Sequence, residues 1–334
     1  MASRINNLAA FHQKLAKADR ILAICGAGLS AASGLPTFRG VGGLWRNYEA
    51  TDLATPEAFA SDPGLVWLFY AYRRHMALQA LPNAGHHALA ALAKKNPNFL
   101  CLTQNVDNLS SRAGHQQQQL HTLHGSLFTL QCSSYPSQCT YIDKNNTLDP
   151  LCPALAPASA SASINPPSND PPNPSHSQPS NPIIPLLDPS TPLPRIPKSH
   201  LPHCPQCKNL LRPGVVWFGE SLNPGMLAEI DAWIDQGGPI DIVLVIGTSS
   251  VVYPAAGYAE KARTKGKTSV VTVNMEVGVE VDDDIEEPRM MWGKGRGRKR
   301  RQEEDLVFQG GAEEWLPRML EPVIGVAKDD GTYE

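Results

Sequence analysis

The stretch from residue 20 to residue 45 constrains the fold more than any other part of the chain. Arg20–Cys25 is a short apolar run, which is the pattern of a buried parallel strand. It ends at the turn Gly26-Ala27-Gly28, where glycines let backbone N–H groups approach a phosphate and the start of a helix adds partial positive charge. This is the chemistry of a dinucleotide site. The spacing is not the ordinary G-x-G-x-x-G, however, and a plain tight turn accounts for the glycines about equally well.

Apolar runs and helical patterns alternate along the rest of the chain. Further strands are predicted at Asn98–Thr103, Val215–Phe218, Asp241–Ile246, Ser269–Val273 and Leu306–Phe308. Helices are predicted at Pro63–Gln79, Gly85–Lys95, Met226–Gln236, Pro254–Thr264 and Glu313–Leu320. The alternation predicts an α/β fold with a Rossmann-like parallel sheet that is covered by helices on both faces.

The composition excludes several classes of protein. The 334 residues carry a net charge of −3, which gives no general attraction to nucleic acid or anionic lipid. No apolar run reaches the roughly 18 residues that span a bilayer, so we expect a soluble chain without a membrane partner. Seven cysteines, an odd number, and the lack of a signal peptide argue against a disulfide framework and for a reducing compartment.

Residues 132–210 differ from their surroundings in composition. They contain five of the seven cysteines, and fourteen of the 30 prolines fall within 151–200. Such a segment buries too little apolar surface to offset the entropy of ordering it, so we predict a disordered insertion at about 154–197. The predicted domains are a first Rossmann-like part at 1–125, a small zinc-binding module at 126–213, and a second Rossmann-like part at 214–334.

A second interruption, which we expect at about 279–304, carries two blocks of opposite charge. Glu280–Glu287 has six acids and Lys294–Arg301 has six bases. Adjacent blocks of this kind indicate a solvated loop, although the run Lys299-Arg300-Arg301 leaves a nuclear-import patch as a second possibility.

The residues that follow the glycine turn identify a family. Pro36-Thr37-Phe38-Arg39-Gly40 comes after the small-residue segment Ser30–Gly34, and the whole stretch 20–45 closely resembles the signature of the sirtuins, the NAD-dependent protein-lysine deacylases. Four more segments match this family in the same order, namely Thr103–Asp107, His124–Ser126, Val215–Glu220 and Gly247–Ser249. The resemblance implies a cleft between the large domain and the zinc module, where NAD and the substrate meet.

The resemblance also implies a mechanism, with His124, Asn105 and Asp107 as the catalytic residues. The acyl-lysine carbonyl oxygen attacks C1′ of the nicotinamide ribose, and nicotinamide leaves. His124 then acts as general base for a ribose hydroxyl, a task that suits a side chain whose pKa lies near the working pH. The products are lysine, nicotinamide and O-acyl-ADP-ribose. Without the resemblance, a lone histidine is more often structural, and polar residues on a loop are turn formers.

The resemblance implies three groups of NAD contacts. The first two are the loop residues Gly26, Ala27, Gly28, Ser30, Pro36, Thr37, Phe38, Arg39 and Trp45, and the polar segment Gln104, Asn105, Val106 and Asp107. The third, on the adenosine side, comprises Gly247, Thr248, Ser249, Asn274, Met275, Glu276 and Ala312. One departure follows Asp107, because the family usually has Leu-His where this chain has Leu109-Ser110, which affects a supporting contact and not the reaction.

Cys204-Pro205-Gln206-Cys207 is a C-x₂-C pair, which is half of a tetrahedral zinc site. Cys132 follows His124 at the family's distance, but the position three residues later is Tyr135, and the next thiol is Cys139. We favour Cys132, Cys139, Cys204 and Cys207 as one structural Zn²⁺ site. Cys152 as the fourth ligand, or free buried cysteines, remain alternatives. Cys25 and Cys101 lie in predicted strands and are expected in the core.

Tyr70 and Arg73 are similar to the Y-x-x-R pair of the class III sirtuins, which reads an acidic acyl chain. A phenol and a guanidinium can hold a carboxylate by charge-assisted hydrogen bonds, each worth about 1.5–3 kcal/mol. Ala54 fits as well, because a small residue there leaves room for a longer acyl group. The resemblance therefore implies a preference for succinyl, malonyl or glutaryl lysine. It also implies that Val216, Gly219, Glu220 and Tyr253 bind the substrate, with its backbone paired as an added strand.

Three other functions stay open: plain deacetylation, an NAD or ADP-ribose binding module without catalysis, and mono-ADP-ribosyl transfer. The expected partners are acylated lysine side chains of proteins, and we expect a monomer that does not bind nucleic acid. The family resemblance favours mitochondria, the basic run favours the nucleus, and the cytosol is the default location.

Overall fold

The computed structural model describes residues 5–37, 44–135, 138–159, 192–248, 255–276 and 305–328, together with Gly331 and Tyr333. The predicted charged loop at 279–304 lies outside these residues. Within the described part, no helix is long and apolar enough to cross a membrane.

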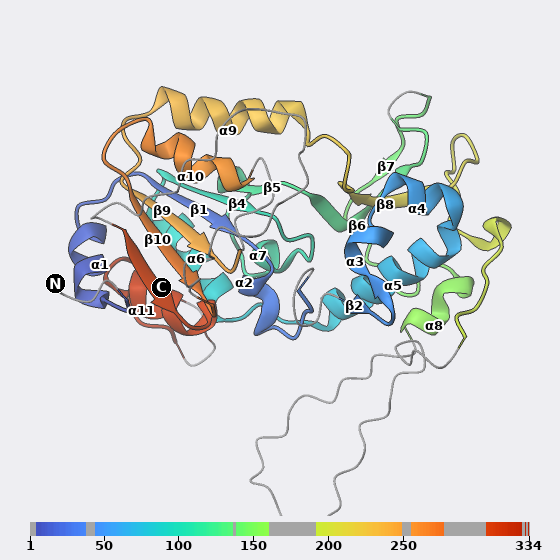
Figure 1. Cartoon of the computed structure of the whole chain (residues 1–334), viewed down its shortest axis with the longest axis horizontal. Coiled ribbons are helices and arrows are strands. Elements are labelled where there is room, and N and C mark those ends of the chain that lie inside the picture. Colours follow the sequence, from blue (N-terminus) through green and yellow to red (C-terminus); the bar gives the residue numbers. More distant parts are fainter. Residues whose placement is uncertain are drawn as a thin grey trace, which may run out of the picture.

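The described residues form a parallel sheet of six strands (Figure 1). In spatial order the strands are β11 (Leu306–Gln309), β10 (Ser269–Asn274), β9 (Ile242–Ile246), β1 (Ile21–Cys25), β4 (Phe99–Thr103) and β5 (Leu120–Thr122). The central strand β1 pairs with β9 on one side and with β4 on the other, both in parallel. All five of its residues are buried, as an apolar strand covered on both faces requires.

Helices cover both faces of this sheet. One face carries α1 (Leu8–Leu15), α6 (Ala84–Lys95) and α11 (Ala312–Ile324), and the other carries α9 (Pro224–Gln236) and α10 (Ala255–Arg263). Residues alternate along β1, because Ile21, Ala23 and Cys25 belong to the first core and Leu22 and Ile24 to the second. The predicted Rossmann-like α/β architecture is confirmed.

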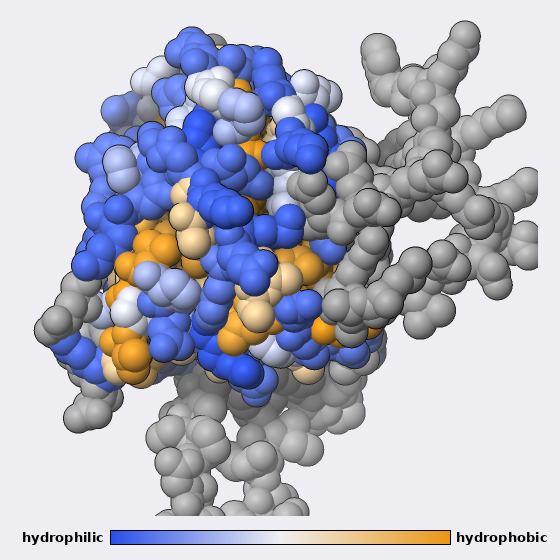
Figure 2. All heavy atoms as spheres, turned by 90° about the vertical axis from the view of Figure 1, so that its left-hand side faces the viewer, coloured by the Kyte–Doolittle hydropathy of each residue, from blue (hydrophilic) through white to orange (hydrophobic). Residues whose placement is uncertain are grey.

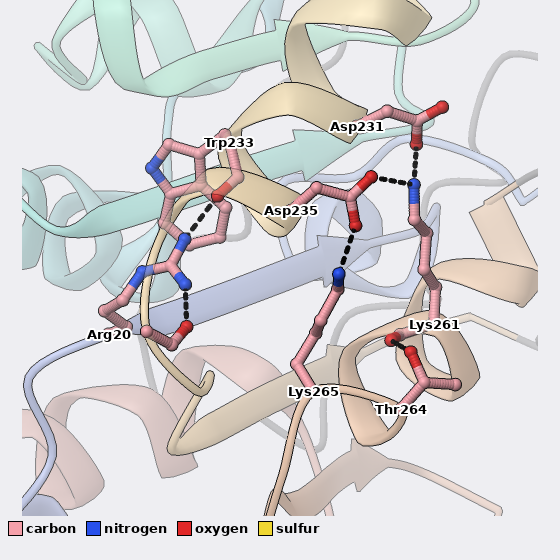
Figure 3. Close-up of polar contacts among 8 residues, drawn as sticks. Arg20, Asp231, Trp233, Asp235, Lys261, Thr264 and Lys265 are labelled. Atoms are coloured by element: carbon pink, nitrogen blue, oxygen red, sulfur yellow. Dashed lines mark hydrogen bonds and ion pairs between the residues drawn. The ribbon is translucent and has the colours of Figure 1, made fainter.

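Polar contacts join α9 to Arg20, the residue before β1, and to the end of α10 (Figure 3). Arg20, at the start of β1, donates to the carbonyl of Trp233 and lies 4.3 Å from the centroid of its ring. Lys261 and Lys265 both pair with Asp235, at N–O distances of 3.3 and 2.8 Å. These lysine pairs are partly exposed, so each contributes little to stability.

A smaller unit lies beside the sheet, on the right in Figure 1. It contains an antiparallel sheet in the order β7 (Ile142–Asp143), β6 (Gly125–Cys132) and β8 (Leu211–Val215). Its helices and short elements are β2 (Leu44–Trp45), β3 (Tyr48–Glu49), α3 (Ala50–Leu53), α4 (Pro56–Ser61), α5 (Pro63–Gln79), η2 (Pro153–Leu155), α8 (Ala156–Ser159) and η3 (Lys198–His200). Helices α3–α5 share one core with the cysteine-bearing strands, so the predicted boundary at residue 125 does not follow the packing.

Two sequence predictions are wrong in this unit. The strand expected at Val215–Phe218 is β8, Leu211–Val215, because the chain turns after Val215 and Glu220 accepts from the Trp217 backbone N–H. The disordered insertion expected at 154–197 is too wide at both ends. Residues 153–159 are helical and bury apolar side chains, and Ile196 packs against the same core. Residues 160–191 lie outside the described part.

Figure 2 views the end of the molecule that carries α1, α11 and the C-terminus. Apolar side chains gather there in separate patches between hydrophilic ones. Ile5 and Val326, which belong to the chain segments at this end, are 48% and 76% exposed. Single exposed side chains such as these two are normal on a protein surface.

Candidate active site

The ends of β1 and β9 meet in a turn that only glycine fits. A Cβ on Gly26 would lie 2.6 Å from the carbonyl oxygen of Gly247, and one on Gly28 would lie 2.6 Å from the Cα of Gly247. Gly247 has φ +55° and would itself press a Cβ to within 2.5 Å of the Leu29 nitrogen. The short helix α2 (Gly28–Ala31) starts here. These glycines therefore bring the backbone of two strand ends into direct contact at the carboxyl edge of the sheet, where open α/β sheets bind ligands.

A buried polar network lies beside this turn. Ser30 donates to Oδ2 of Asp107 at 2.7 Å, and the Asn105 side-chain amide donates to Ser30 Oγ at 3.1 Å and to the Gly26 carbonyl at 2.9 Å. Leu109, at the start of α7 (Leu109–Arg112), donates its N–H to Oδ1 of Asp107 at 2.9 Å. Burial raises the pKa of Asp107, while these hydrogen bonds lower it. The network fixes the orientation of Asn105 and Asp107 after β4.

Gln104 connects three strand ends. Its N–H donates to the Cys25 carbonyl at 2.9 Å, and its side-chain amide donates to Oγ1 of Thr248 at 3.1 Å. Its carbonyl accepts from Nδ1 of His124 at 3.0 Å. The structure therefore brings together residues from β1, β4, β9 and the segment after β5 that the sequence had grouped only by resemblance.

His124 has the geometry of a general base. A carbonyl oxygen can only accept, so Nδ1 carries the proton and the neutral ring keeps a lone pair on Nε2. The side chain is half-buried, and this burial lowers the pKa of His124 below its usual value. His124 is therefore mostly neutral at pH 7 and ready to accept a proton at Nε2.

Tyr70 and Arg73 lie on α5, inside the smaller unit. Tyr70 is 0% exposed, and its hydroxyl oxygen accepts from Nε1 of Trp217 at 3.0 Å. Burial raises the pKa of Tyr70, so the hydroxyl stays protonated. The guanidinium of Arg73 lies 5.7 Å from the centroid of the Phe69 ring, and its charge partly offsets the burial that raises the pKa of Asp107. Tyr70 is therefore buried, whereas Arg73 on the same helix is half-buried.

The loop after β8 contacts His124 and Ala54. Val216 donates its N–H to the His124 carbonyl at 2.9 Å, and Phe218 donates to the carbonyl of the buried Ala54 at 2.9 Å. Gly219 has φ +87° with no atom within 4 Å of its ideal Cβ position. Glu220 pairs with Arg212, so its carboxylate is held by the protein.

The other predicted NAD residues are spread more widely. Asn274 donates to the Thr248 carbonyl at 3.4 Å, and the neighbouring Met275 is 67% exposed. Trp45 is buried and packs edge-on against Phe69 at 5.6 Å, which places it in the core of the smaller unit. The remaining residues divide by exposure: Val106 and Ala312 are buried, Ala27, Pro36 and Thr37 are half-buried, and Glu276 is exposed. Four predicted site residues, Phe38, Arg39, Ser249 and Tyr253, lie outside the described residues.

Sequence reasoning missed several residues that hold the site. Arg212 and Trp217 support the loop after β8, and Asn83 donates to Oγ of Ser33 at 3.0 Å and to the Leu29 carbonyl at 2.8 Å. His86 lies with Nε2 3.4 Å from Ser30 Oγ. The N-cap position of Asn83 before α6 was a detectable signal for a helix start, but no local pattern indicates its contact with α2.

Four cysteines form the candidate metal centre. The sulfur atoms of Cys132, Cys139, Cys204 and Cys207 all lie within 4.8 Å of one another, with Cys132–Cys207 at 3.3 Å and Cys139–Cys204 at 3.7 Å. Zn–S bonds of about 2.3 Å in a tetrahedron put sulfur atoms about 3.8 Å apart, so the set fits zinc with four protein ligands. Cys152 instead donates to the His200 carbonyl at 3.4 Å and lies outside the group.

The two remaining thiols have no place in this centre. Cys25 and Cys101 are fully buried in β1 and β4, with their sulfur atoms 3.7 Å apart. They pack in the core of the sheet, as the sequence predicted.

A model of the Sir2 family matches residues 26–254, which is more than half of the chain. The chain belongs to the Sir2 family. Relatives include an NAD-dependent protein deacylase of Candida albicans, 43% identical over 327 residues that cover 94% of this chain and 97% of the relative. The mitochondrial NAD-dependent protein deacylase sirtuin-5 of Canis lupus familiaris is 42% identical over 280 residues, which cover 83% and 79%.

Solved structures of Sir2 proteins have the same fold. A Sir2 homologue in complex with NAD superposes with a TM-score of 0.64 and 29% identity, covering 93% of this chain and 91% of the other. A mutant Sir2 homologue with 2′-O-acetyl-ADP-ribose has a TM-score of 0.65 and 29% identity, covering 93% and 94%. The Sir2 assignment thus agrees with the sheet, the glycine turn and the cysteine centre described above.

Proposed function

We propose that this protein is an NAD-dependent protein-lysine deacylase that prefers acidic acyl groups such as succinyl, malonyl and glutaryl. The observation that carries the proposal is the position of Tyr70 and Arg73. Tyr70 is buried on α5, Arg73 is half-buried one turn later, and the charge of Arg73 partly offsets the burial that raises the pKa of Asp107. A cation and a phenol donor beside the catalytic network suit an acyl chain that ends in a carboxylate.

The relatives support the reaction type. The Candida albicans relative and the sirtuin-5 relatives of four vertebrates are named NAD-dependent protein deacylases. A similar solved structure is a complex with NAD, and another holds 2′-O-acetyl-ADP-ribose. These names favour the same cosubstrate and acylated product for this chain.

Each residue of the site has a proposed task. When bound, NAD supplies the ribose carbon that accepts the acyl oxygen and the nicotinamide that leaves. Gln104, Asn105 and Asp107 orient the ribose and carboxamide, since their side chains are held by hydrogen bonds. His124 takes the proton of a ribose hydroxyl at Nε2, because Nδ1 is occupied by the Gln104 carbonyl. Arg73 and Tyr70 bind the acyl carboxylate and thereby position the scissile amide.

Zinc has a structural task in this proposal. Four thiolates close its coordination sphere, which leaves no open position for a substrate. The ion would fix the turn at Cys204–Cys207 against β6, next to the strand that leads into the substrate loop.

The sirtuin-5 relatives carry the word mitochondrial in their names, whereas the Candida albicans relative does not. We therefore propose a mitochondrial location and acylated lysines of proteins as the substrates, with the protein acting as a monomer. Cell fractionation and sedimentation of the purified protein test the location and the monomer.

The acyl preference is tested with two peptides of one sequence, carrying succinyl-lysine or acetyl-lysine. The wild type is expected to prefer succinyl-lysine in kcat/KM. Arg73→Met is expected to lower kcat/KM for succinyl-lysine by about 10- to 100-fold, because it removes charge-assisted hydrogen bonds. It should affect acetyl-lysine far less. Arg318→Met, at an exposed position on α11, is the matched control and should leave both values near wild type.

His124→Ala completes the set and should abolish turnover of both peptides while NAD still binds. Equal or faster turnover of acetyl-lysine by the wild type would contradict the acidic preference and leave a deacetylase. NAD binding without nicotinamide release from either peptide would contradict the catalytic proposal altogether.

A further inference from the structure

Trp217 connects the loop after β8 with helix α5, which carries Tyr70 and Arg73. Its indole N–H donates to the Tyr70 hydroxyl oxygen at 3.0 Å, and the two rings lie 6.4 Å apart at 37°. An indole N–H is a donor only. The Tyr70 hydroxyl therefore cannot donate back to Trp217, and its own hydrogen must point to a different acceptor.

The indole is held on several sides. The guanidinium carbon of Arg212 lies 3.4 Å from the centroid of the Trp217 ring, and Phe59 packs on it at 5.2 Å. Glu220 accepts from two nitrogens of Arg212, at 2.5 and 2.8 Å, and from the Trp217 backbone N–H at 2.8 Å. Trp217 is 3% exposed. Its N–H therefore has one direction available, toward Tyr70.

A carboxylate can only accept hydrogen bonds, so it needs donors in the pocket. Trp217 occupies one acceptor direction of the Tyr70 oxygen and leaves the hydroxyl hydrogen free to donate. Burial raises the pKa of Tyr70, which keeps that hydrogen in place. The phenol is therefore oriented as a donor before the acyl group binds, so binding costs little orientational entropy.

We propose that Trp217 is a positioning residue for acyl selectivity, acting through Tyr70. This inference rests on the proposed function, because it concerns the same pocket. The Glu220–Arg212 pair extends the arrangement to the substrate loop, since the same carboxylate holds the Trp217 backbone and stands next to Gly219. The same contacts among Arg212, Glu220 and Trp217 thus hold both the loop that would bind the peptide backbone and the phenol that would bind the acyl carboxylate.

The test is a double-mutant cycle with Trp217→Phe, Tyr70→Phe and the double variant, using succinyl-lysine and acetyl-lysine peptides of one sequence. Phenylalanine keeps an aromatic ring under Arg212 and removes the N–H. We expect Trp217→Phe to lower the succinyl-to-acetyl ratio of kcat/KM about tenfold, mainly through KM for the succinyl peptide. In the Tyr70→Phe background the same substitution should change the ratio very little.

A second variant separates the hydrogen bond from packing. Benzothienylalanine at position 217, introduced by nonsense suppression, keeps the bicyclic shape and lacks the N–H, so it should lower the ratio as Trp217→Phe does. Equal losses on both peptides, or the same loss of ratio with and without the Tyr70 hydroxyl, would overturn the inference. A wild type without succinyl preference would overturn the proposed function as well, whereas a wild type with the preference and an uncoupled cycle would overturn the inference alone.

Discussion

Two regions of the molecule are built by different means. One is the nucleotide edge, the glycine turn at the carboxyl ends of β1 and β9, and the other is the proposed acyl pocket around Tyr70, Arg73 and Trp217, here called the acyl end. At the nucleotide edge, the backbone makes the shape, because Gly26 and Gly28 each lie directly against Gly247. At the acyl end, side chains make the shape, through the contacts of Trp217 with Tyr70 and with Arg212. The first region therefore depends on glycines, which have no side chain. The second depends on the hydrogen bonds and ring contacts that each side chain makes.

The largest effect is expected at the zinc centre, which lies in the smaller unit and not at the glycine turn. Cys204→Ser removes one of four ligands, and structural zinc contributes directly to folding, so we expect loss of bound zinc and of all deacylation. The core below the glycine turn is separate from the core that contains Cys132, Cys139 and Cys204. Metal content by mass spectrometry and activity are the measurements.

Cys152→Ser is the matched control, because this thiol lies outside the group. It should retain one zinc per chain and full activity. Zinc retained in Cys204→Ser, or lost in Cys152→Ser, would show that the ligand set is different.

Gly247→Ala tests the backbone-built edge and should have a smaller but specific effect. The new Cβ would meet the Leu29 nitrogen at 2.5 Å and would hold alanine at φ +55°, a conformation that costs about 1–2 kcal/mol. The turn must open, so we expect KM for NAD to rise at least about tenfold. The succinyl-to-acetyl ratio should stay unchanged, because the acyl end is built elsewhere.

Gly114→Ala is the control that separates backbone strain at positive φ from a steric clash of the new Cβ. Gly114 has φ +83° and no atom within 4 Å of its ideal Cβ position, so alanine there meets the conformational cost alone. KM for NAD should remain near the wild-type value. A rise equal to that of Gly247→Ala would mean that close contact between the strand ends does not matter.

The smallest expected effect is a shift in pH dependence. His124 acts when neutral, and burial lowers its pKa, so activity should be complete above that pKa and lost as pH falls through it. The acid limb of kcat/KM should therefore have its midpoint below the ordinary histidine value of about 6.5. The acetyl peptide is the right substrate for this measurement, because it brings no carboxylate of its own. A midpoint above 6.5 would contradict the buried, uncharged state of His124.

The contrast between the two regions also explains what could be predicted from sequence. Strand β1 and the glycine turn are local patterns, and the resemblance carried Asn105, Asp107 and His124 to positions that the structure joins by hydrogen bonds. The four cysteines were grouped correctly even though the spacing between Cys132 and Cys139 is unusual. Local sequence patterns predict a site well where its contacts follow from the order of strands in the sheet.

The acyl end was predicted less completely, for a physical reason. Trp217 meets Tyr70 across 147 positions of sequence, and no local periodicity encodes such a pair. The strand expected at Val215–Phe218 failed for the same reason, because Glu220 and Arg212 turn an apolar run away from the sheet. The apolar residues of α8 lie in a proline-rich segment, and their burial depends on packing against helix α5, which is distant in sequence.

The central claim is that this protein transfers an acidic acyl group from lysine to the ribose of NAD, with His124 as the general base. Competition tests it most directly, with equal amounts of succinyl-lysine and acetyl-lysine peptides of one sequence, limiting NAD and mass spectrometry of the ADP-ribose products. The account predicts O-succinyl-ADP-ribose in clear excess over O-acetyl-ADP-ribose, with one nicotinamide released for each. Equal amounts, or an excess of the acetyl product, would contradict it.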